Sequence, residues 1–305
     1  MNRLLWSLIL VAGAAWGGIV SDVRVALNRH DFKAAEQQVA AFRKQNGSTP
    51  EALEALSWLG RGALDQGRRE DAERYAGETR KLVLEQLKTR SLDADRHLAA
   101  ALGAAIEVQA GVLAGRGQRS EAVSYLGREL KTYRNTSIRT RIQKNLNVLS
   151  LEGKPAPPLN VGRWLGPRPE SLAALRGRTV LLFFWAHWCP DCKDEVPVLV
   201  KVAERFAKRG LVLVGPTEHY GYVAKGEEAT PEQETPYIDT VRRAVYAAVG
   251  PMPVPLDEEN FKVYGASTVP TLVLIDRRGI VRLYHPDVMP YEELAGAIER
   301  VLAGG

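Results

Sequence analysis

The chain has 305 residues, of which 45% are hydrophobic and 25% are charged, and its formal net charge is +5. This balance is typical of a globular protein long enough for two domains, and it excludes a disordered or fibrous chain. The mild positive charge gives no indication of nucleic-acid binding, and the two cysteines are too few for a disulfide-rich scaffold.

Residues 1–20 are predicted to be a signal peptide or a membrane anchor. A positive charge at Arg3 is followed by an uncharged apolar run, then by small residues, and the first acid is Asp22. This order is typical of a secretory signal. The uncharged stretch is also close to the shortest length that spans a membrane. A cleaved signal and a membrane tether through residues 4–20 therefore both stay open. We expect no other stretch of the chain to be long and apolar enough to span.

Residues 21–152 are predicted to form an all-α helical-repeat domain, because apolar residues recur at helical spacing and segment 58–76 can be aligned with segment 108–126. A degenerate copy lies at 27–40. The aligned positions are the turn glycines Gly67 and Gly117 and the helix alanines Ala35, Ala72 and Ala122. These segments resemble tetratricopeptide repeats, and an unrelated antiparallel helical bundle is the alternative. Such a domain binds or positions a partner.

The segment 131–144 within this region carries five basic residues and no acid. Two interpretations are open: a contact with an acidic partner or an anionic membrane surface, or an ordinary solvated helix face.

A Pro-rich linker is predicted at 153–160, and an α/β domain at 161–305. Three prolines in four residues cannot continue a helix. Beyond them, apolar runs alternate with amphipathic segments. The expected elements, in order, are a strand at 179–186, a helix at 190–210, a strand at 211–215, a helix at 242–249, strands at 271–276 and 280–285 joined by a hairpin, and a helix at 290–305.

Both cysteines lie in the sequence WAHWCPDC, where the first predicted strand ends and a helix begins. At a helix start the free N–H groups and the helix dipole stabilise an anion, so Cys189 is expected to supply a thiolate. Pro190 suits the first helical position. Cys192 lies one turn further on, where it can attack a mixed disulfide formed on Cys189. A disulfide that closes so short a loop adds little stability.

A metal site is the rival use of a Cys-x-x-Cys pair. Structural zinc needs four ligands, and the chain has no second pair of cysteines. His187 and His285 would complete a set only if the fold brought both to the cysteines.

The residues around the pair resemble the thioredoxin-fold active site. The matching residues are Phe184, Trp185, Ala186, Trp188, Cys189, Cys192 and Lys193. Asp194, Glu195 and Pro197 continue the pattern in the way of the exported TlpA/ResA-like branch. The motif Thr268-Val269-Pro270-Thr271 follows, with Pro270 78 residues after Cys192. The resemblance covers the C-terminal half and leaves the helical half uncovered.

The resemblance implies a thiol–disulfide oxidoreductase. Cys189 reacts first and Cys192 resolves, Pro270 is cis and shapes the substrate groove, the backbone at Val269 pairs with substrate, and Trp188 packs at the site. No cofactor is expected besides the redox-active disulfide. The implied partners are protein thiols or disulfides of the cell envelope and an upstream redox partner, in the periplasm or envelope of a bacterium. A role as reductant is favoured over one as oxidant, because Asp191 places negative charge near the thiolate.

Three features depart from the family pattern or extend it. Phe183 stands where thioredoxin has a buried acid, so Glu218 and Glu195 are the candidates for a proton relay. His187 is expected to be an exposed residue at the rim of the site. The segment 218–239 is predicted to be an insertion after the second strand. Two interpretations are open: it lies over the active-site face and chooses partners, or it is a surface excursion without a role. The alternative functions are a non-enzymatic helical-repeat adapter and a copper-delivery protein, each with a thioredoxin-like module.

Overall fold

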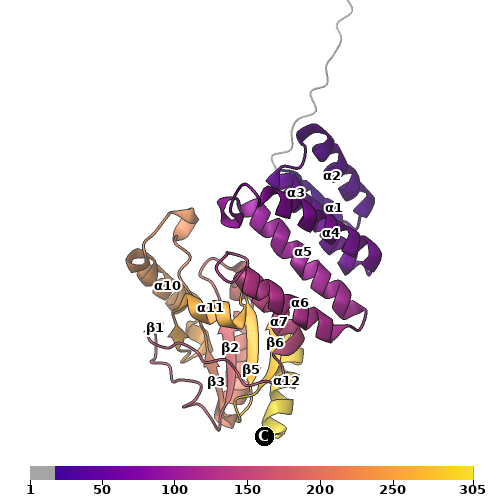
Figure 1. The fold of residues 1–305 in the computed structure, drawn as a ribbon. Coiled ribbons are helices and arrows are strands. Elements are labelled where there is room, and N and C mark those ends of the chain that lie inside the picture. Colours follow the sequence, from indigo (N-terminus) through magenta and orange to yellow (C-terminus); the bar gives the residue numbers. More distant parts are fainter. Residues whose placement is uncertain (1–17, 305) are drawn as a thin grey trace, which may run out of the picture. The chain divides into compact units, whose positions relative to one another are not determined.

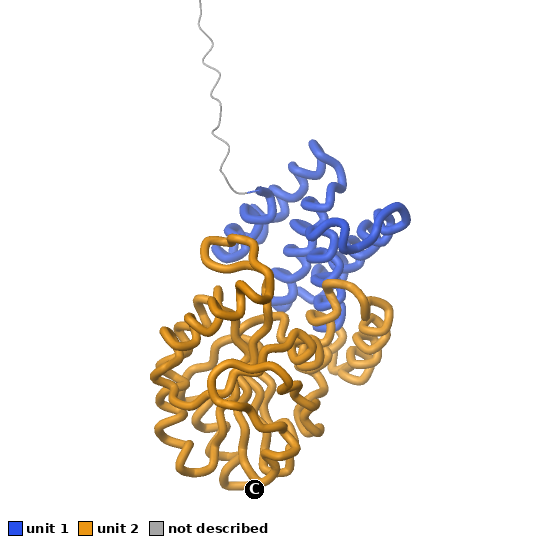
Figure 2. Tube along the Cα trace, turned by 90° about the vertical axis from the view of Figure 1, so that its left-hand side faces the viewer, with its two compact units in different colours: residues 1–112 blue, residues 113–305 orange. Residues whose placement is uncertain are grey.

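The structure is a computed structural model that describes residues 18–304. The predicted signal or anchor lies outside this range, apart from residues 18–20. The chain divides into two compact units, residues 1–112 and 113–305 (Figure 2). This division falls inside a helix, and it differs from the predicted boundary at the Pro-rich linker 153–160.

The first unit consists of helices joined by short turns (Figure 1). They are α1 Ile19–Asn28, α2 Phe32–Asn46, α3 Pro50–Asp65, α4 Arg69–Gln86, the 3₁₀ turn η1 Leu92–Ala94 and most of α5 Arg96–Gly115. Local signals fix several helix starts. Asp31 accepts a hydrogen bond from the Ala34 amide at 2.9 Å, and Thr49 caps α3 just before Pro50.

The aligned segments share a backbone feature at their turns. Gly67 and Gly117 have φ of 72° and 80°, and His30 has φ of 59° at the matching place in the degenerate copy. A left-handed turn favours glycine, which explains two of the three residues. The aligned alanines Ala35, Ala72 and Ala122 are all 0% exposed. The N-terminal half is predominantly helical, as predicted. Its resemblance to tetratricopeptide repeats stays a prediction.

Helix α5 is long and apolar enough to span a membrane, although no stretch beyond the N-terminus was expected to be. By length and composition, it is the one helix among residues 18–304 that meets this test. Of its apolar window, 61% is buried inside the protein, and the core helix of a globular domain passes the same test. The helix is therefore weak evidence for a span.

A four-stranded sheet forms the centre of the second unit. Its strands are β2 Thr179–Phe184, β3 Leu211–Val214, β5 Thr271–Ile275 and β6 Val281–Pro286, in the order β3-β2-β5-β6. Strand β2 is parallel to β3 and antiparallel to β5, and β5 forms a hairpin with β6. A short pair, β1 Trp164–Leu165 and β4 Val254–Pro255, lies outside this sheet. The order strand, helix, strand, then hairpin and helix is the predicted thioredoxin-like α/β fold.

Helices cover the sheet on both faces. The helices that follow β2 in the chain are α8 Pro190–Asp194, α9 Val196–Phe206, α10 Pro231–Val245, α11 Glu258–Tyr264 and α12 Tyr291–Ala303. Two helices precede β2 in the chain: α6 Arg119–Thr132 and α7 Arg139–Ser150. The 3₁₀ turns of this unit are η2 Ala207–Arg209, η3 Ala224–Gly226 and η4 Ala247–Val249. Because side chains alternate along a strand, Leu181 and Phe183 of β2 enter one core cluster while Leu182 and Phe184 enter the other. All six residues of β2 are buried, so the strand is held from both sides.

The predicted helix 190–210 is broken into two. Helix α8 ends at Asp194, and α9 begins at Val196. Pro197 lies at the second position of α9, where it cannot donate to a preceding turn and its ring disfavours a continuous helix. Cys192 therefore lies on a short separate helix.

The predicted insertion 218–239 contains the start of a helix. Helix α10 begins at Pro231, where Thr230 and Gln233 form a capping box, and it runs on to Val245. The expectation of a helix confined to 242–249 was therefore wrong. Only residues 218–230 form a loop, with η3 inside it.

The predicted linker is fixed to the sheet. Backbone groups of this segment bond to the start of β6: Gly153 N donates to Val281 O, and Val281 N donates to Lys154 O, each at 2.9 Å. Tyr264 Oη also donates to Pro157 O at 2.6 Å. These bonds, and the packing of α7 against α11, explain why the second unit begins before the linker.

Candidate active site

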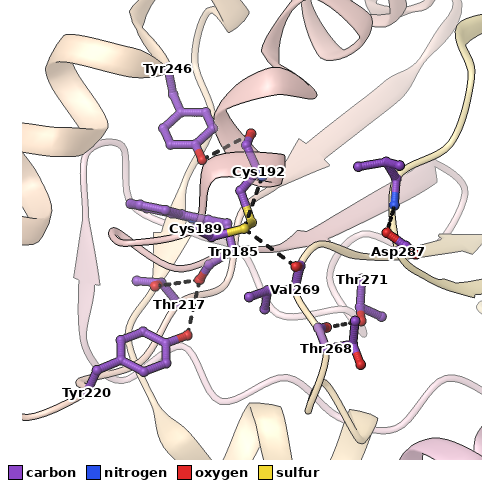
Figure 3. Close-up of a disulfide and its surroundings, with 11 residues drawn as sticks. Trp185, Cys189, Cys192, Thr217, Tyr220, Tyr246, Thr268, Val269, Thr271 and Asp287 are labelled. Carbon is purple, nitrogen blue, oxygen red and sulfur yellow. Dashed lines mark hydrogen bonds between the residues drawn. A yellow bond between two sulfur atoms is a disulfide. The ribbon is translucent and has the colours of Figure 1, made fainter. Parts of the chain in front are cut away.

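Cys189 and Cys192 are joined by a disulfide, with their Cα atoms 5.3 Å apart (Figure 3). Cys189 is the N-cap of α8, and its Sγ accepts a hydrogen bond from the Cys192 amide at 3.0 Å. Pro190 occupies the first helical position. After reduction, the same amide and the helix N-terminus stabilise a thiolate on Cys189. Cys189 is 2% exposed and Cys192 0%, so Cys189 lies nearer the surface.

The Val269–Pro270 loop lies against the cysteine pair. The peptide bond between these two residues is cis, as the resemblance implies. The Val269 carbonyl oxygen is 3.5 Å from Cys189 Sγ, within reach of the thiol once the disulfide is reduced. Thr271 Oγ1 donates to Thr268 O at 2.6 Å, and Asp287 N donates to Pro270 O at 2.9 Å. The loop is thus held on both sides of the proline (Figure 3).

The two tryptophans of the motif have different environments. Trp185 is fully buried, its Nε1 donates to Gly215 O at 2.9 Å, and its ring centroid is 4.7 Å from that of Tyr246. The Tyr246 hydroxyl reaches Cys192 O at 3.4 Å. Trp188 is 44% exposed. Trp185 therefore packs in the core behind the cysteine pair, whereas Trp188 is available to a partner.

A groove of about 370 Å³ adjoins the cysteines. Its lining comprises Thr140, Trp188, Glu218, Tyr220, Ala266, Ser267, Thr268 and Val269. Three residues singled out from the sequence, Trp188, Glu218 and Val269, therefore meet here. Thr140 comes from α7, which the sequence motifs do not include.

Glu195 lies elsewhere, at the junction of α8 and α9. Its side chain is buried, and Oε1 accepts a hydrogen bond from the Met289 amide at 3.4 Å. Burial raises the pKa of Glu195, and the bond from Met289 partly offsets this. The carboxyl thus links the end of the cysteine helix to the segment between β6 and α12.

Glu218 has an unusual proton affinity for a carboxyl group. Burial raises the pKa of Glu218 to about 8, and the nearby Glu258 carboxylate adds to the effect while Lys262 opposes it. No hydrogen bond or ion pair reaches this carboxyl from the described part of the chain. Glu218 is therefore mostly protonated at neutral pH, with room in the groove for an outside partner.

We expect Glu218→Gln to change how stability depends on pH. Between pH 4.5 and about 8 the folded protein keeps a proton that the unfolded chain releases, so the native protein loses stability as pH rises through this window. Glutamine does not titrate, so the variant should gain on the order of 1 to 2 kcal/mol relative to the native protein between pH 5 and pH 8. Urea unfolding at both pH values measures this gain. The exposed Glu227, replaced by Gln, is the control, and a gain no larger than the control's would contradict the assignment.

His187 was predicted to be exposed, and this was wrong. Its side chain is 1% exposed, with Nε2 3.1 Å from Glu234 Oε1. Three tyrosine rings surround the imidazole edge-on, with centroids 5.2 to 5.5 Å away. Burial lowers the pKa of His187, and Glu234 partly opposes this, so the neutral ring donates from Nε2. Its Nδ1 is buried and has no partner among residues 18–304.

Sequence reasoning missed Glu234, which anchors the loop that carries Glu218. Its side chain is 0% exposed. Oε1 accepts from Tyr220 N at 2.7 Å, and Oε2 accepts from Gly221 N at 2.9 Å. The only signal in the sequence was its place four residues after Thr230, at a helix start. The pair of His187 and Glu234 therefore joins the cysteine motif to the loop 218–222.

We expect Glu234→Ala to destabilise the protein by about 3 kcal/mol, because two backbone N–H groups and His187 lose their acceptor. The denaturant midpoint measures this loss, and Glu227→Ala, an exposed change in the same loop, should cost less than about 0.5 kcal/mol. Equal midpoints for the two variants would show that the buried carboxylate does not hold the loop.

A thioredoxin-like sheet with Cys-x-x-Cys at its first strand–helix turn, opposite a cis proline, defines the class of thioredoxin-like thiol–disulfide oxidoreductases. The comparisons with known proteins agree. Residues 153–284 match the model of the AhpC/TSA family. The C-terminal half therefore has the fold and cysteine site of a thiol–disulfide oxidoreductase, and it is similar to relatives of the TlpA/ResA-like kind.

Three curated relatives illustrate the similarity. The thioredoxin-like protein YneN of Bacillus subtilis is 27% identical over 145 residues, covering 47% of this chain and 76% of YneN. The thiol:disulfide interchange protein DsbE of Pseudomonas fluorescens is 32% identical over 140 residues, covering 43% of this chain and 64% of DsbE. The thiol-disulfide oxidoreductase ResA of Geobacillus thermodenitrificans is 24% identical, covering 44% and 69%. Each match covers less than half of this chain.

Proposed function

We propose that this protein is exported and reduces disulfides of cell-envelope proteins through Cys189 and Cys192. The observation that carries the proposal is the position of Cys189, which caps α8 and faces the Val269 carbonyl at 3.5 Å. The N-terminal signal pattern supports export to the periplasm or envelope, with a membrane tether through residues 4–20 if the signal is retained.

In the proposed reaction the Cys189 thiolate attacks one sulfur of a client disulfide. A mixed disulfide forms, and the other client sulfur leaves as a thiolate that takes up a proton. Cys192 then gives up its proton and attacks the Cys189 sulfur, which releases the second client thiol. The client gains two electrons and two protons, and the pair becomes a disulfide. An upstream redox partner must return the two electrons and two protons.

A carboxylate is the proposed acceptor for the Cys192 proton, and the chain offers Glu195 and Glu218. A group works best as a proton relay when its pKa is near the working pH. The pKa of Glu218, about 8, meets this condition: the carboxyl is mostly protonated at neutral pH, and its smaller ionised fraction accepts the proton. Glu218 also shares the groove with Val269. Glu195 is three residues after Cys192, and its buried carboxyl is bonded to Met289. We therefore favour Glu218 as the relay.

We infer the direction of electron flow from the charge near Cys189. Asp191 lies exposed between the cysteines, where its negative charge opposes the helix effect on the thiolate. A less stabilised thiolate makes the pair more reducing. A redox titration should place the midpoint nearer about −270 mV than about −120 mV, and Asp191→Asn should shift it to a less negative value. A midpoint near about −120 mV would make the protein a disulfide donor instead.

The second candidate function is a non-enzymatic adapter, favoured only by the large helical region, for which we propose a docking role. A double variant with both cysteines replaced by serine distinguishes the two. If it retains full activity in the cell, the adapter function holds and disulfide exchange does not. Copper delivery was the other alternative function, and no observation favours it. Within residues 18–304, no group of three or more His, Cys, Asp or Glu side chains is placed to hold a metal ion.

A further inference from the structure

We propose that helix α7 forms one wall of the client groove and that this groove selects extended, uncharged client segments next to the reacting cysteine. The inference rests on the proposed disulfide exchange and adds the part of the client that is recognised. Helix α7 ends at Ser150, before the family match begins at residue 153, so this wall is a feature of the present chain outside the matched domain.

Helix α7 is held firmly against the segment that leads to the cis proline. Asn147 is 4% exposed, and its Nδ2 donates to Tyr264 O at 2.8 Å. Tyr284 Oη donates to the same carbonyl at 2.9 Å. Near the start of α7, Arg139 forms an ion pair with Glu259 of α11 at 3.0 Å. The helix therefore has a fixed position relative to the loop 265–270.

The groove places α7 beside the exchange reaction. Thr140, in the first turn of α7, lines it together with Thr268 and Val269, and the Val269 carbonyl is 3.5 Å from Cys189 Sγ. A client bonded to Cys189 through its own sulfur has neighbouring residues within a few ångströms of that atom. Because the groove of about 370 Å³ opens there, those residues occupy it.

The lining determines which client residues fit. None of its eight residues is basic, so a client carboxylate finds no cation among them. Thr140, Ser267 and Thr268 offer hydroxyl groups, and Trp188 and Tyr220 offer rings. Glu218 stays protonated up to about pH 8, so it can donate a hydrogen bond to a client carbonyl or amide but offers little charge to a client lysine. These groups together favour uncharged residues.

The experiment uses the reduced full-length protein and three disulfide-linked peptides that differ only in the two residues beside the cysteine. These residues are Gln-Tyr, Asp-Asp or Lys-Lys, and bis(2-hydroxyethyl) disulfide serves as a small probe that does not fill the groove. Stopped-flow tryptophan fluorescence at pH 7 gives the rate constants. The native protein should reduce the Gln-Tyr peptide about tenfold faster than either charged peptide, which corresponds to about 1.4 kcal/mol.

Two replacements at Thr140 test the wall itself. Thr140→Trp should slow the Gln-Tyr peptide about tenfold, while Thr140→Asp should shift the preference toward the Lys-Lys peptide by a similar factor. The smaller aspartate suits a helix start, so this variant tests the proposal even if the tryptophan variant does not fold. The same two replacements at Val148, which is 48% exposed on α7, are the matched controls.

The outcomes separate the two proposals. The wall is supported if the Thr140 variants change the peptide rates as described while their rates with the small probe and their midpoint potential stay near those of the native protein. Peptide rates in the Thr140 variants equal to those in the Val148 variants would overturn it, and so would equal native rates for the three peptides. If the native protein fails to reduce the small probe, the proposed disulfide exchange fails instead.

Discussion

Replacing Cys189 with serine should abolish disulfide reduction, and replacing Cys192 with serine should leave the protein bonded to its client. Cys189 caps α8, and its Sγ accepts a hydrogen bond from the Cys192 amide at 3.0 Å. Cys189 is therefore the cysteine that becomes a thiolate and attacks. A serine hydroxyl at 189 cannot replace a thiolate as nucleophile at neutral pH. We expect the exchange rate to fall at least about a thousandfold.

The Cys192→Ser variant should complete the first half of the reaction only. Cys189 forms the mixed disulfide, but no second thiolate is present to release the client, so the adduct accumulates. Non-reducing electrophoresis with mass spectrometry detects the adduct, and loss of the band on adding dithiothreitol confirms its disulfide nature.

The two cysteine variants control each other, because the same chemical change is made three residues apart. Adduct on Cys192 in the Cys189→Ser protein would reverse the assigned roles. Adduct in neither variant, with both folded, would indicate that the pair does not exchange disulfides.

The sequence predicted the parts of the molecule that depend on local pattern. Strand β2 is a continuous apolar run, and it is buried on both faces as a central strand should be. The spacing of Cys189 and Cys192 within a strand–helix turn predicted their pairing. The resemblance implied that Pro270 lies against them. Each of these features follows from periodicity, or from a motif whose geometry is local or shared with known proteins.

The parts that were missed depend on contacts between residues distant in the chain. His187 looks like a polar rim residue until Glu234, 47 positions later, supplies a buried acceptor. The Pro-rich segment looks like a free linker, but its backbone pairs with β6 more than 120 residues away. Thr140 enters the groove only because α7 packs on α11. Neither periodicity nor composition contains these long-range pairings.

The second large effect is expected at Gly265, the residue that lets α7 approach the cis-proline segment. Gly265 ends α11 in a left-handed conformation, with φ of 65° and ψ of 33°. A Cβ at this position would collide with the backbone of α7, at Lys144 N and at 2.7 Å from Gln143 C. Backbone atoms of a packed helix cannot move aside as a flexible side chain can. Gly265→Ala should therefore lower the free energy of unfolding by about 3 to 5 kcal/mol.

Gly210→Ala is the matched control for this prediction. Gly210 is also left-handed, with φ of 93° and ψ of 13° after η2, but a Cβ there meets nothing within 4 Å. It should cost only the strain of a left-handed alanine, about 1 kcal/mol. Urea unfolding of both variants measures the difference, which reports the contact between α7 and the cis-proline segment alone. If the two variants lose the same stability, α7 is not fixed there, and the wall of the groove has no rigid support.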